Sequence, residues 1–465
     1  MRSRGLFALL GVTAACAFAA QSAIAEPFHV QFPGHFGDAP PTTAQCETAI
    51  QIACYGPLQY QQAYNMKPLY RAGLTGAGKT IVIVDSFGSP TIKDDLNTFD
   101  AAYGLPGPPS FNVITPDGPV NQNDPDAPGW GVETSLDVEY SHAMAPGANI
   151  LLVETPVAET EGVTGLPEMM AAENFVINHH LGDVITQSFG ATEATFPNAR
   201  SILQLRSAFF NALVHHVTVL ASSGDAGPTD ATAAPDAEDF YPFRVNSWPS
   251  ADPLVTSVGG THLQLDGNGN RLAPDSVWND GTELFNMFGG DFSPAAGGGG
   301  DSAVFSRPFY QDRVANVTGR MRGTPDISMS AAVDGGANVF WSFPGAGEPG
   351  WNIIGGTSEA SPLFSGVVAI ADQAAGHDLG LINPALYDHG DNSGRGSSKA
   401  DGVVDVTHGN TTVTFENPAG DPFPGTHTVQ GFNADRGYDL ATGLGTADGT
   451  QLVTELAGRN GFKRH

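Results

Sequence analysis

The stretch that decides the fold is IIGGTSEASP at residues 353–362, followed by the apolar run 363–372. Two glycines and a threonine lead into Ser358, at the point where an apolar helix is expected to begin. A hydroxyl group there can be exposed, and the Ser358 amide lies at the positive end of the helix dipole, where it can donate to an oxyanion. A lone serine in this place is commonly only a helix cap, but the length of the string favours a nucleophile.

Upstream of this stretch, short apolar runs alternate with segments of helical periodicity. The pattern predicts strands at 80–85, 148–154, 183–188 and 217–222 and helices at 91–103, 166–181 and 199–216. Strands that are apolar throughout and separated by helices are typical of a parallel sheet covered on both faces. We therefore expect an α/β fold with a mostly parallel central sheet flanked by helices on both faces. The region 253–343 is richer in β signals, and DGNGN at 266–270 predicts a hairpin turn.

The residues that directly follow these strands are the first candidates for a functional site, because ligands of open parallel sheets bind beyond the carboxyl ends of the strands. Asp85 ends the first strand, Ser188 and Gly190 stand at the end of the third, and Asp225 follows the fourth. We expect Ser188 and Gly190 to contact the substrate. Asp225 stands in SSGDAG, where an aspartate taken alone is more often a turn residue.

A serine nucleophile needs a base, and the segment that would hold a histidine in a subtilisin-like triad contains none. His142 is the nearest histidine, nine residues beyond Glu133 and so more than two helical turns away. Glu133 and Asp137 are four residues apart and so share one helix face. Spacing alone is typical of a solvated face, although two buried carboxyl groups so placed would raise one pKa. An Asp85–His142–Ser358 triad therefore stays open as an alternative.

Three motifs in order resemble the sedolisin family of serine-carboxyl peptidases, which have the subtilisin-like fold, over residues 64–447. The glutamate and aspartate ahead of an APGA segment match Glu133 and Asp137, the SSGD turn matches Asp225, and GTSxxxP matches Ser358. The resemblance implies that Glu133 is the general base, that Asp137 holds and tunes it, and that protonated Asp225 donates to the oxyanion.

The expected activity is the hydrolysis of protein or peptide substrates at acidic pH, as an endopeptidase or a tripeptidyl-peptidase. A carboxylate base has a pKa far below that of histidine, and an aspartic acid donates a hydrogen bond only while it is protonated. The formal charge of −29 suits work in acid and makes nucleic acid a poor partner. The alternatives are a subtilisin-like peptidase with a neutral or alkaline optimum and a catalytically inert secreted relative.

The resemblance also implies one calcium ion near the C-terminus. VVDVT at 403–407 and DRGYD at 435–439 resemble the two halves of the family's calcium site. Hard oxygen ligands are what Ca²⁺ takes. By position, the carboxylates come from Asp405 and Asp439 and the backbone carbonyls from Val406, Asp435 and Gly437. Asp435 stands where the family usually has glycine.

GLTGAGKT at residues 73–80 matches the pattern of a phosphate-binding loop at every position. That mechanism needs a strand before the loop and a helix after it, so that amides at the helix N-terminus face the phosphates. Here the strand TIVIVD follows the loop. We therefore expect a glycine-rich turn into the first strand and no nucleotide.

The N-terminus has the pattern of a secretory signal peptide. Arg2 and Arg4 precede an apolar run at 6–20, and AIA precedes a cleavage site predicted after Ala25. The apolar run is too short for a membrane anchor, so we expect a secreted or periplasmic protein.

The rest of the chain is expected to form one domain behind a short leader. Cys46 and Cys54 are predicted to form a disulfide, since export makes one chemically available. Residues 26–60 would form a short N-terminal segment, too short for the long folded prosegment that sedolisins usually have. Residues 61–465 would form the peptidase domain of a monomer.

Overall fold

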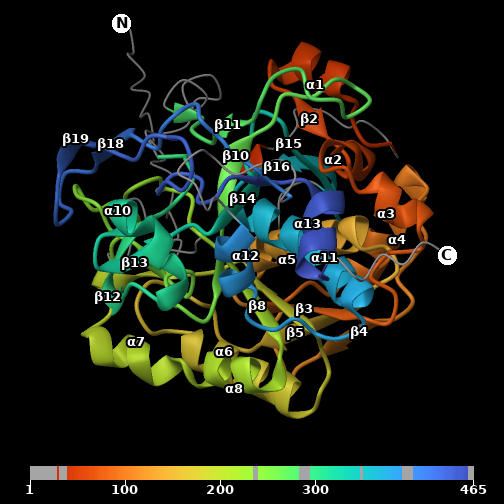
Figure 1. The fold of residues 1–465 in the computed structure, drawn as a ribbon, viewed down its shortest axis with the longest axis horizontal. Helices are drawn as coiled ribbons and strands as arrows, with labels where there is room; N and C mark the ends of the chain where they lie inside the picture. The colour runs from red at the N-terminus through yellow and green to blue at the C-terminus, as the bar shows by residue number, and fades with distance from the viewer. Residues whose placement is uncertain are drawn as a thin grey trace, which may run out of the picture.

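The computed structural model describes residues 29–30, 39–233, 239–281, 294–345, 349–389 and 402–458. The signal peptide expected up to Ala25 lies outside these residues. Figure 1 shows a central sheet with helices packed on both of its faces. No helix in the described ranges is long and apolar enough to cross a membrane.

The central sheet is mostly parallel, as expected. Its order across the sheet is β17 (Val403–Val404), β20 (Thr446–Ala447), β14 (Ile327–Ser330), β10 (Thr256–His262), β8 (Thr218–Ser222), β6 (Val184–Gln187), β3 (Thr80–Ser86), β5 (Asn149–Thr155) and β4 (Phe111–Ile114), with β11 (Ser276–Val277) beside β10. Only the pairs β17–β20 and β10–β11 are antiparallel among these strands. The carboxyl ends of β3, β5, β6 and β8 therefore share one edge of the sheet, where the site residues are expected.

Alternate residues of β3 enter two different cores, as the side-chain period of a strand requires. Ile81 and Ile83 pack with residues of the helices on one face, and Val82 and Val84 pack on the other. All four are buried completely, which is why the strand reads as a continuous apolar run.

The helices form one layer on each side of the sheet. One layer contains α5 (Ala127–Met144), α11 (Thr357–Ala375), α4 (Ile92–Tyr103), α13 (Gly449–Leu456) and α2 (Pro57–Ala63). The other contains α6 (Leu166–Asn178), α7 (Ala199–Leu205) and α8 (Ser207–His215), which lie together at the bottom of Figure 1. The remaining helical segments are α1 (Thr43–Ile50), α3 (Lys67–Arg71), α10 (Ala315–Thr318), α12 (Asn383–His389) and the short 3₁₀ helices η1 (Glu193–Thr195) and η2 (Phe309–Val314).

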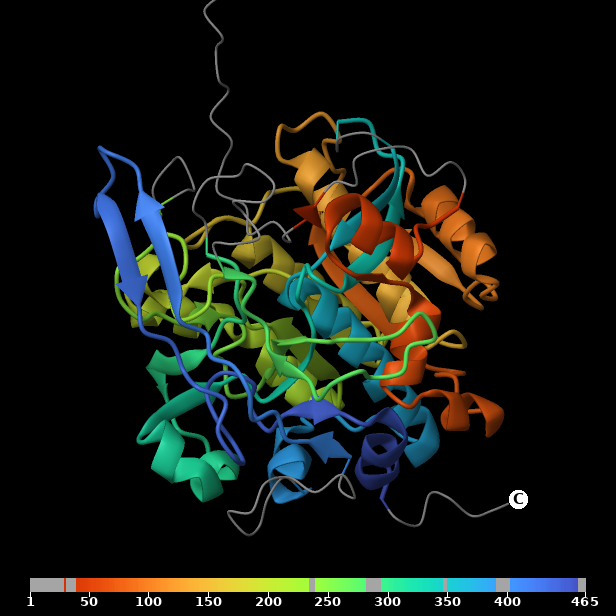
Figure 2. The ribbon, with the colours of Figure 1, turned by 90° about the horizontal axis from the view of Figure 1, so that it is seen from above.

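Smaller sheets surround the central one. The first has the order β1 (His29–Val30), β16 (Gly350–Ile354), β15 (Gly336–Trp341) and β2 (Cys54–Tyr55). Three antiparallel pairs are β7 (Ala191–Thr192) with β9 (Ser247–Trp248), β12 (Gly300–Ser306) with β13 (Met321–Thr324), and β18 (Val413–Asn417) with β19 (Gly425–Val429). Figure 2 shows the β18–β19 pair at the edge of the molecule.

Two predicted helices differ from the observed ones. The helix expected over 199–216 is split into α7 and α8 at Arg206, where ψ is 6°. The Arg206 side chain donates to both carboxylate oxygens of Asp252, so a contact distant in sequence holds the break. The helix expected over 166–181 ends at Asn178, and His180 has a positive φ of 52°. The predicted turn at 266–270 is present, since Asp266 accepts from the Gly269 amide and donates to Asn270.

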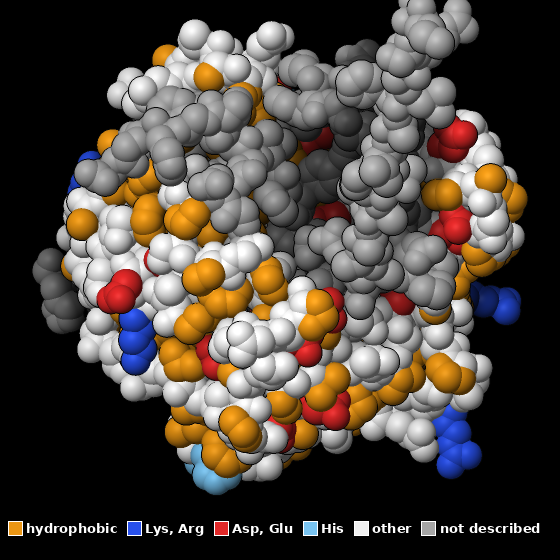
Figure 3. Space-filling model, turned by 180° about the vertical axis from the view of Figure 1, so that it is seen from behind, with side chains coloured by type: hydrophobic (Ala, Val, Ile, Leu, Met, Phe, Trp, Pro, Cys, Tyr) orange, Lys and Arg blue, Asp and Glu red, His pale blue; other side chains and the backbone are white. Residues whose placement is uncertain are grey.

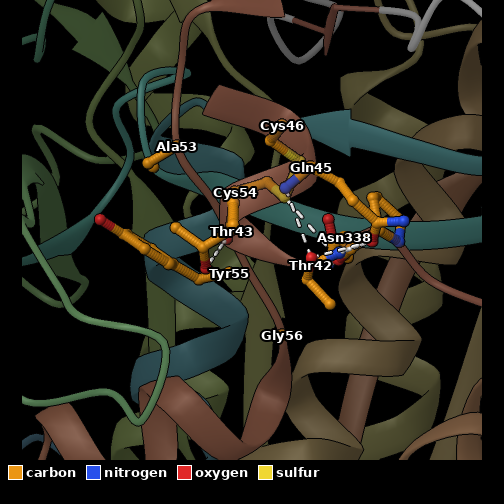
Figure 4. Close-up of a disulfide and its surroundings, with 12 residues drawn as sticks. Thr42, Thr43, Gln45, Cys46, Ala53, Cys54, Tyr55, Gly56 and Asn338 are labelled. Carbon is orange, nitrogen blue, oxygen red and sulfur yellow. Dashed lines mark hydrogen bonds between the residues drawn. A yellow bond between two sulfur atoms is a disulfide. The ribbon is translucent and has the colours of Figure 1, made fainter. Parts of the chain in front are cut away.

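The predicted disulfide between Cys46 and Cys54 is confirmed, and it links α1 to β2 (Figure 4). The Thr42 side chain accepts from the Gln45 amide and caps α1, and the Thr43 hydroxyl donates to the carbonyl of Cys54 at 2.9 Å. The bridge therefore supports contacts that already hold this helix against the strand.

Candidate functional site

Ser358 lies in the first turn of α11, directly after β16 and two glycines. The chain turns sharply here, because Gly356 has a φ of 112°, a conformation that favours glycine. A Cβ atom on Gly355 would lie 2.5 Å from the backbone oxygen of Ala331, so a side chain is excluded there as well. Ser358 is only 5% exposed. The glycine pair thus places a serine hydroxyl at a helix N-terminus against the sheet.

Glu133 and Asp137 lie on α5, which packs closely along α11. A Cβ atom on Gly366 of α11 would lie 2.4 Å from the Cβ atom of Met144, so the glycine permits the close approach of the two helices. Every residue of α5 from Trp130 onwards is buried. The solvated-face interpretation of the Glu133–Asp137 spacing is therefore wrong for this helix.

Ser188 connects Asp137 to the serine segment. Its hydroxyl oxygen lies 2.8 Å from Asp137 Oδ1 and 3.4 Å from the backbone oxygen of Ser358. The Ser188 side chain therefore supports the Asp137 carboxylate, and its contact with substrate stays a prediction. Gly190, two residues on, lies against the backbone of Trp248, since a Cβ atom there would be 3.2 Å from the Trp248 oxygen.

Burial and mutual repulsion raise the pKa values of the carboxyl groups around Ser358. Burial is the main cause of the raised pKa of Glu133, and the charges of Asp137, Asp85 and Asp225 add to it. Burial and then the Asp85 charge raise the pKa of Asp137. Burial raises the pKa of Asp85 to about 7, although the Thr134 hydroxyl donates to it at 2.9 Å. The site therefore holds protons on several of its carboxyl groups in acid.

The contact between Ser358 and Glu133 is loose. The Ser358 hydroxyl is near enough to lower the pKa of Glu133, yet neither carboxylate oxygen of Glu133 makes a hydrogen bond of good geometry. The two side chains are therefore in close contact without a formed hydrogen bond. Catalytic hydrogen bonds are often long before substrate binds and tighten with it.

Asp225 reaches the same helix terminus from the loop after β8. Its Oδ1 atom accepts from the Thr357 amide at 2.7 Å and from the Thr357 hydroxyl at 2.6 Å. Part of the residue remains accessible, but burial of its carboxyl group raises its pKa to about 6. Because Oδ1 accepts two hydrogen bonds, Oδ2 is the oxygen that can carry a proton below pH 6 and donate it in a hydrogen bond.

His142 lies away from this cluster. Its Nε2 atom is 2.8 Å from the backbone oxygen of Pro106 and 3.2 Å from Asp100 Oδ1, and the side chain is buried. Nine residues along α5 from Glu133 correspond to about 13 Å of helix. The structure therefore does not place His142 beside Ser358, as an Asp85–His142–Ser358 triad requires.

The two segments proposed for calcium meet in space. The Gly437 amide lies 3.3 and 3.2 Å from the two carboxylate oxygens of Asp405. The Asp439 carboxylate accepts from the amides of Asp435 at 2.9 Å and Thr442 at 2.8 Å. A cavity of about 350 Å³ adjoins the 435–439 loop. Within the described ranges no group of three or more His, Cys, Asp or Glu side chains is placed to hold a metal.

The donors of the two segments nevertheless fit Ca²⁺ in kind. Asp405 and Asp439 supply hard carboxylate oxygens, and the expected carbonyl ligands lie in the same two loops, one of them at Val406. Amide donors now occupy the carboxylates, so an ion would have to replace some of these hydrogen bonds.

The segment 73–79 leads into β3, which begins at Thr80, in the order that the sequence predicts. The Gln373 side chain accepts from the amides of Thr75 and Gly76 at 2.8 Å each, and Lys79 pairs with Asp183 and Asp378. The amides and the lysine that would hold phosphates in a nucleotide site therefore have partners from the protein itself.

Two contributors to the site were not singled out from the sequence. Thr357 fixes Asp225, and Thr134 donates to Asp85. Thr357 is part of the GGTS string and Thr134 lies next to Glu133, so both stand inside motifs that were noted for another residue. Their roles depend on which neighbour they face, and a sequence does not show that.

The chain is similar to several curated peptidases. It is 30% identical over 420 residues to kumamolisin from Bacillus sp. (strain MN-32), covering 89% of this chain and 65% of that protein. It is 31% identical over 392 residues to sedolisin from Pseudomonas sp. (strain 101), covering 83% and 59%. It is 27% identical over 342 residues to tripeptidyl-peptidase 1 from Homo sapiens, covering 70% and 52%. The chain thus spans between about half and two thirds of these relatives' lengths.

The chain is also similar to a peptidase of known structure. Pseudomonas sedolisin, a serine-carboxyl proteinase complexed with two molecules of pseudo-iodotyrostatin, matches with a TM-score of 0.66 and 28% identity, over 88% of this chain and 100% of that chain. No model of a known protein family matches the chain. The structural match establishes the expected subtilisin-like α/β fold.

Proposed function

Because this chain belongs to the sedolisin family, we propose that it hydrolyses peptide bonds in acid with Ser358 as the nucleophile. The observation that supports this most is the meeting of two helices: the first turn of α11 holds Ser358, and the buried face of α5 holds Glu133 and Asp137. Asp225 reaches the same terminus and contacts Thr357 next to the serine.

Glu133 is the proposed general base. As the Ser358 oxygen bonds to the carbonyl carbon of the substrate, its proton passes to a carboxylate oxygen of Glu133. Asp137 and Asp85 share their protons with this group, and Ser188 holds Asp137 in place. Proton sharing lets one negative charge remain in a buried cluster that could not hold three.

Asp225 is the proposed donor to the oxyanion. Its protonated Oδ2 atom and the Ser358 amide would bind the oxygen on which negative charge develops. The amides of the first helical turn have no partner within the helix and face the positive end of its dipole.

The reaction would then finish in two stages. The carbon–nitrogen bond breaks as Glu133 returns the proton to the leaving amine, which leaves an ester on Ser358. A water molecule, deprotonated by Glu133, attacks that ester, and the proton returns to the Ser358 oxygen as the acid product leaves.

We also propose one structural Ca²⁺ ion between the 403–407 and 435–439 segments, with the ligands named above. The ion would supply positive charge between two loops that carry Asp405 and Asp439, and it takes no part in the reaction.

Export from the cell is proposed as well. Its support is the signal-like N-terminus and the disulfide between Cys46 and Cys54, a bond of oxidising compartments.

The test is the cleavage of a denatured protein as a function of pH. Wild-type enzyme should show a rate that is high in acid and falls as pH rises through about 6, where Asp225 loses its proton. Ser358→Ala should show no cleavage at any pH. Glu133→Gln should lower kcat by about 10²-fold or more, the usual contribution of a general base. The masses of the products distinguish internal cleavage from the release of tripeptides.

Two outcomes would reject this function. A rate that is unchanged in Glu133→Gln would remove the proposed base. No hydrolysis by the folded wild type at any pH would identify the chain as an inert member of the family. Glu416→Gln, on the exposed part of β18, is the matched control for a glutamate change and should leave the rate unaltered.

A further inference from the structure

Most of the large apolar side chains that are exposed lie on one side of the protein. Ten such side chains are exposed among the described residues, and six of them belong to α6, α7 and α8 or closely follow α6. Figure 3 shows hydrophobic and histidine side chains at the lower end of the molecule, where Figure 1 places these helices. An apolar patch that stays exposed on a folded protein is typical of a site for another protein or a membrane. The six residues are Phe175, Leu181, Leu203, Phe210, Leu213 and Val214.

The helix α8 is apolar on its outer side as well as on its inner side. Ala208, Phe209 and Ala212 are buried against the core, as is usual for one side of a surface helix. The opposite side, which is normally polar, carries Phe210, which is 51% exposed, and Val214, which is 72% exposed. Packing of the core therefore does not account for these two side chains.

Asparagine side chains hold α6 and α8 side by side. The Asn211 amide group donates to the side-chain oxygens of Asn174 and Asn178 at 3.0 Å each. The Asn174 amide group in turn donates to the Ser207 hydroxyl at 3.0 Å. These contacts advance along both helices in the same direction, so α6 and α8 run parallel and end together. Their exposed side chains therefore share one surface.

Both helices end in a pair of histidines. His179 and His180 directly follow α6, whereas His215 is the last residue of α8 and His216 is its C-cap. His180 and His216 have φ values of 52° and 59°, in the left-handed region where glycine is usual at helix ends. The ring centroids of His180 and His215 are 5.5 Å apart. We call these four histidines and the six apolar residues the α6–α8 surface.

In acid, the histidines give the α6–α8 surface a positive charge. The negative ends of two helix dipoles lie at these positions and favour that charge. In the described ranges the histidines that pair with a carboxylate are His142 and His262, and neither belongs to this surface. The acidic residues within the three helices are Glu168, in the first turn of α6 and so at the end away from the histidines, and Glu173, which is buried. The positive charge is thus left without a carboxylate partner on this surface.

The carboxylates that approach the histidines from neighbouring elements are already paired. The loop 376–380 packs against His216, since a Cβ atom on its last glycine would lie 3.0 Å from the Cα atom of this histidine. Asp378 in this loop and Asp183, which precedes β6, both form ion pairs with Lys79. They therefore do not neutralise the histidines.

The other titrating or charged groups nearby are mostly cationic. His377 lies next to Asp378 and gains a positive charge in acid. On α7, Arg200 is exposed, and the Arg206 side chain pairs with Asp252. The α6–α8 surface is therefore apolar and cationic in acid, although the formal charge of the whole chain is −29.

We propose that the α6–α8 surface binds the face of an anionic lipid bilayer in acid. Phe210, Leu213 and Val214 enter the boundary between the headgroups and the acyl chains, and the histidines contact lipid phosphates. Binding of phosphate also relieves the repulsion between imidazolium groups that lie side by side. The proposal goes beyond the peptidase function and does not depend on it, since it uses none of the residues around Ser358.

A second copy of this chain is the other occupant that an exposed apolar patch suggests, and the charges oppose it. Two α6–α8 surfaces that faced each other would repel in acid, because both are cationic. An acidic region of a second copy is a poor partner as well, since its carboxyl groups take up protons in acid. Phosphodiester groups of lipids keep their negative charge there. The charges therefore favour lipid.

The experiment is the sedimentation of Ser358→Ala protein with vesicles of phosphatidylcholine and phosphatidylglycerol, at pH 5 and pH 7.5. The partition coefficient should be at least about tenfold larger at pH 5, because several cationic side chains then act together near an anionic surface, while acid lowers the repulsion by the other carboxylates. Vesicles of phosphatidylcholine alone should bind at least about tenfold less protein at pH 5.

The apolar contribution is tested with Phe210→Ser/Val214→Ser, which should lower the partition coefficient at pH 5 at least about tenfold. Leu272→Ser/Phe309→Ser is the matched control, since these side chains are 70% and 73% exposed on other parts of the protein. The control should bind as the parent does. All four positions are exposed, and thermal unfolding of each variant verifies that it is folded.

The histidines are tested separately with His180→Asn/His216→Asn, because asparagine also tolerates a positive φ. This variant should reduce the ratio of the partition coefficients at the two pH values at least about threefold. His408→Asn, at an exposed histidine outside this surface, should leave the ratio unchanged.

Three results would overturn the proposal. The first is no sedimentation with the anionic vesicles at pH 5, and the second is equal sedimentation with both kinds of vesicle. The third comes from sedimentation velocity without lipid: a dimer at pH 5 that Phe210→Ser/Val214→Ser abolishes would assign the surface to a second copy of the chain. None of these measurements depends on peptidase activity, so an inactive protein gives the same answer.

Discussion

Glu173 allows a direct measurement of how much a buried carboxyl group makes the folded protein more stable in acid than at neutral pH. The side chain lies on α6, is completely buried, accepts a hydrogen bond from Gln187 and has no partner for Oε2. Burial raises its pKa from 4.5 to about 8, and the Gln187 bond only partly opposes this. The native protein therefore keeps a proton here that the unfolded chain releases.

The sign and size of the effect follow from this difference. The stabilisation by the bound proton is complete below the unfolded pKa and is lost as pH rises towards the folded pKa of about 8. Between pH 4.5 and 7.5 the loss is about 3 to 4 kcal/mol, at 1.36 kcal/mol for each unit. Glu173→Gln removes the titration but keeps an acceptor for Gln187. Its stability relative to wild type should thus improve by that amount over the same interval.

The assay is urea unfolding at pH 4.5 and 7.5, followed by tryptophan fluorescence, with Ser358→Ala in both proteins to prevent self-digestion. The difference in the free energy of unfolding between Glu173→Gln and wild type is taken at each pH, and one difference is subtracted from the other. The contributions of all titrating groups that the substitution does not affect then cancel. Glu416→Gln, an exposed glutamate, should show a much smaller change. A shift below about 1 kcal/mol for Glu173→Gln would refute the reasoning, because it would mean that Glu173 ionises in the folded protein almost as in the unfolded one.

Three further predictions concern the site and the calcium loops. Asp225→Ala should lower kcat about 10²- to 10³-fold, as loss of an oxyanion donor does, whereas Asp225→Asn should keep more activity and extend it above pH 6, as pH–rate profiles would show. His142→Gln should change kcat/KM by less than about tenfold, because this side chain contacts Pro106 and Asp100 and not the nucleophile. Adding a calcium chelator should lower the unfolding temperature of the wild type in a thermal scan, and Asp405→Asn should abolish that response.

The fold was predictable to the extent that its strands are buried on both faces. β3, β5, β6 and β8 were each located to within one or two residues, because apolar runs of this length have few other uses. The break between α7 and α8 was not predictable. It is held by Arg206 and Asp252, which are 46 residues apart, and local periodicity carries no record of such a contact.

In the candidate site, too, the motifs were predictable from sequence, and the features that depend on contacts distant in sequence were not. The resemblance of three motifs in order predicts Ser358, Glu133 and Asp225 as site residues, whereas the Glu133–Asp137 spacing alone is more typical of a solvent-exposed face. Glu133 and Asp137 are buried because α5 packs against α11, a contact that the spacing does not show.

The structure also changes how the acid requirement is explained. From sequence, the acid requirement followed from a base with the low pKa of a free carboxylate and from an Asp225 that donates only while it is protonated. In the structure, burial and repulsion among Asp85, Glu133 and Asp137 raise the pKa of Glu133, so the base is stronger than a free carboxylate but needs a higher pH to lose its proton. The upper pH limit would come from Asp225, the proposed oxyanion donor, which can donate only while it is protonated, up to about pH 6. For the proposed activity, the base Glu133 would thus set the lower pH limit and the oxyanion donor Asp225 the upper one.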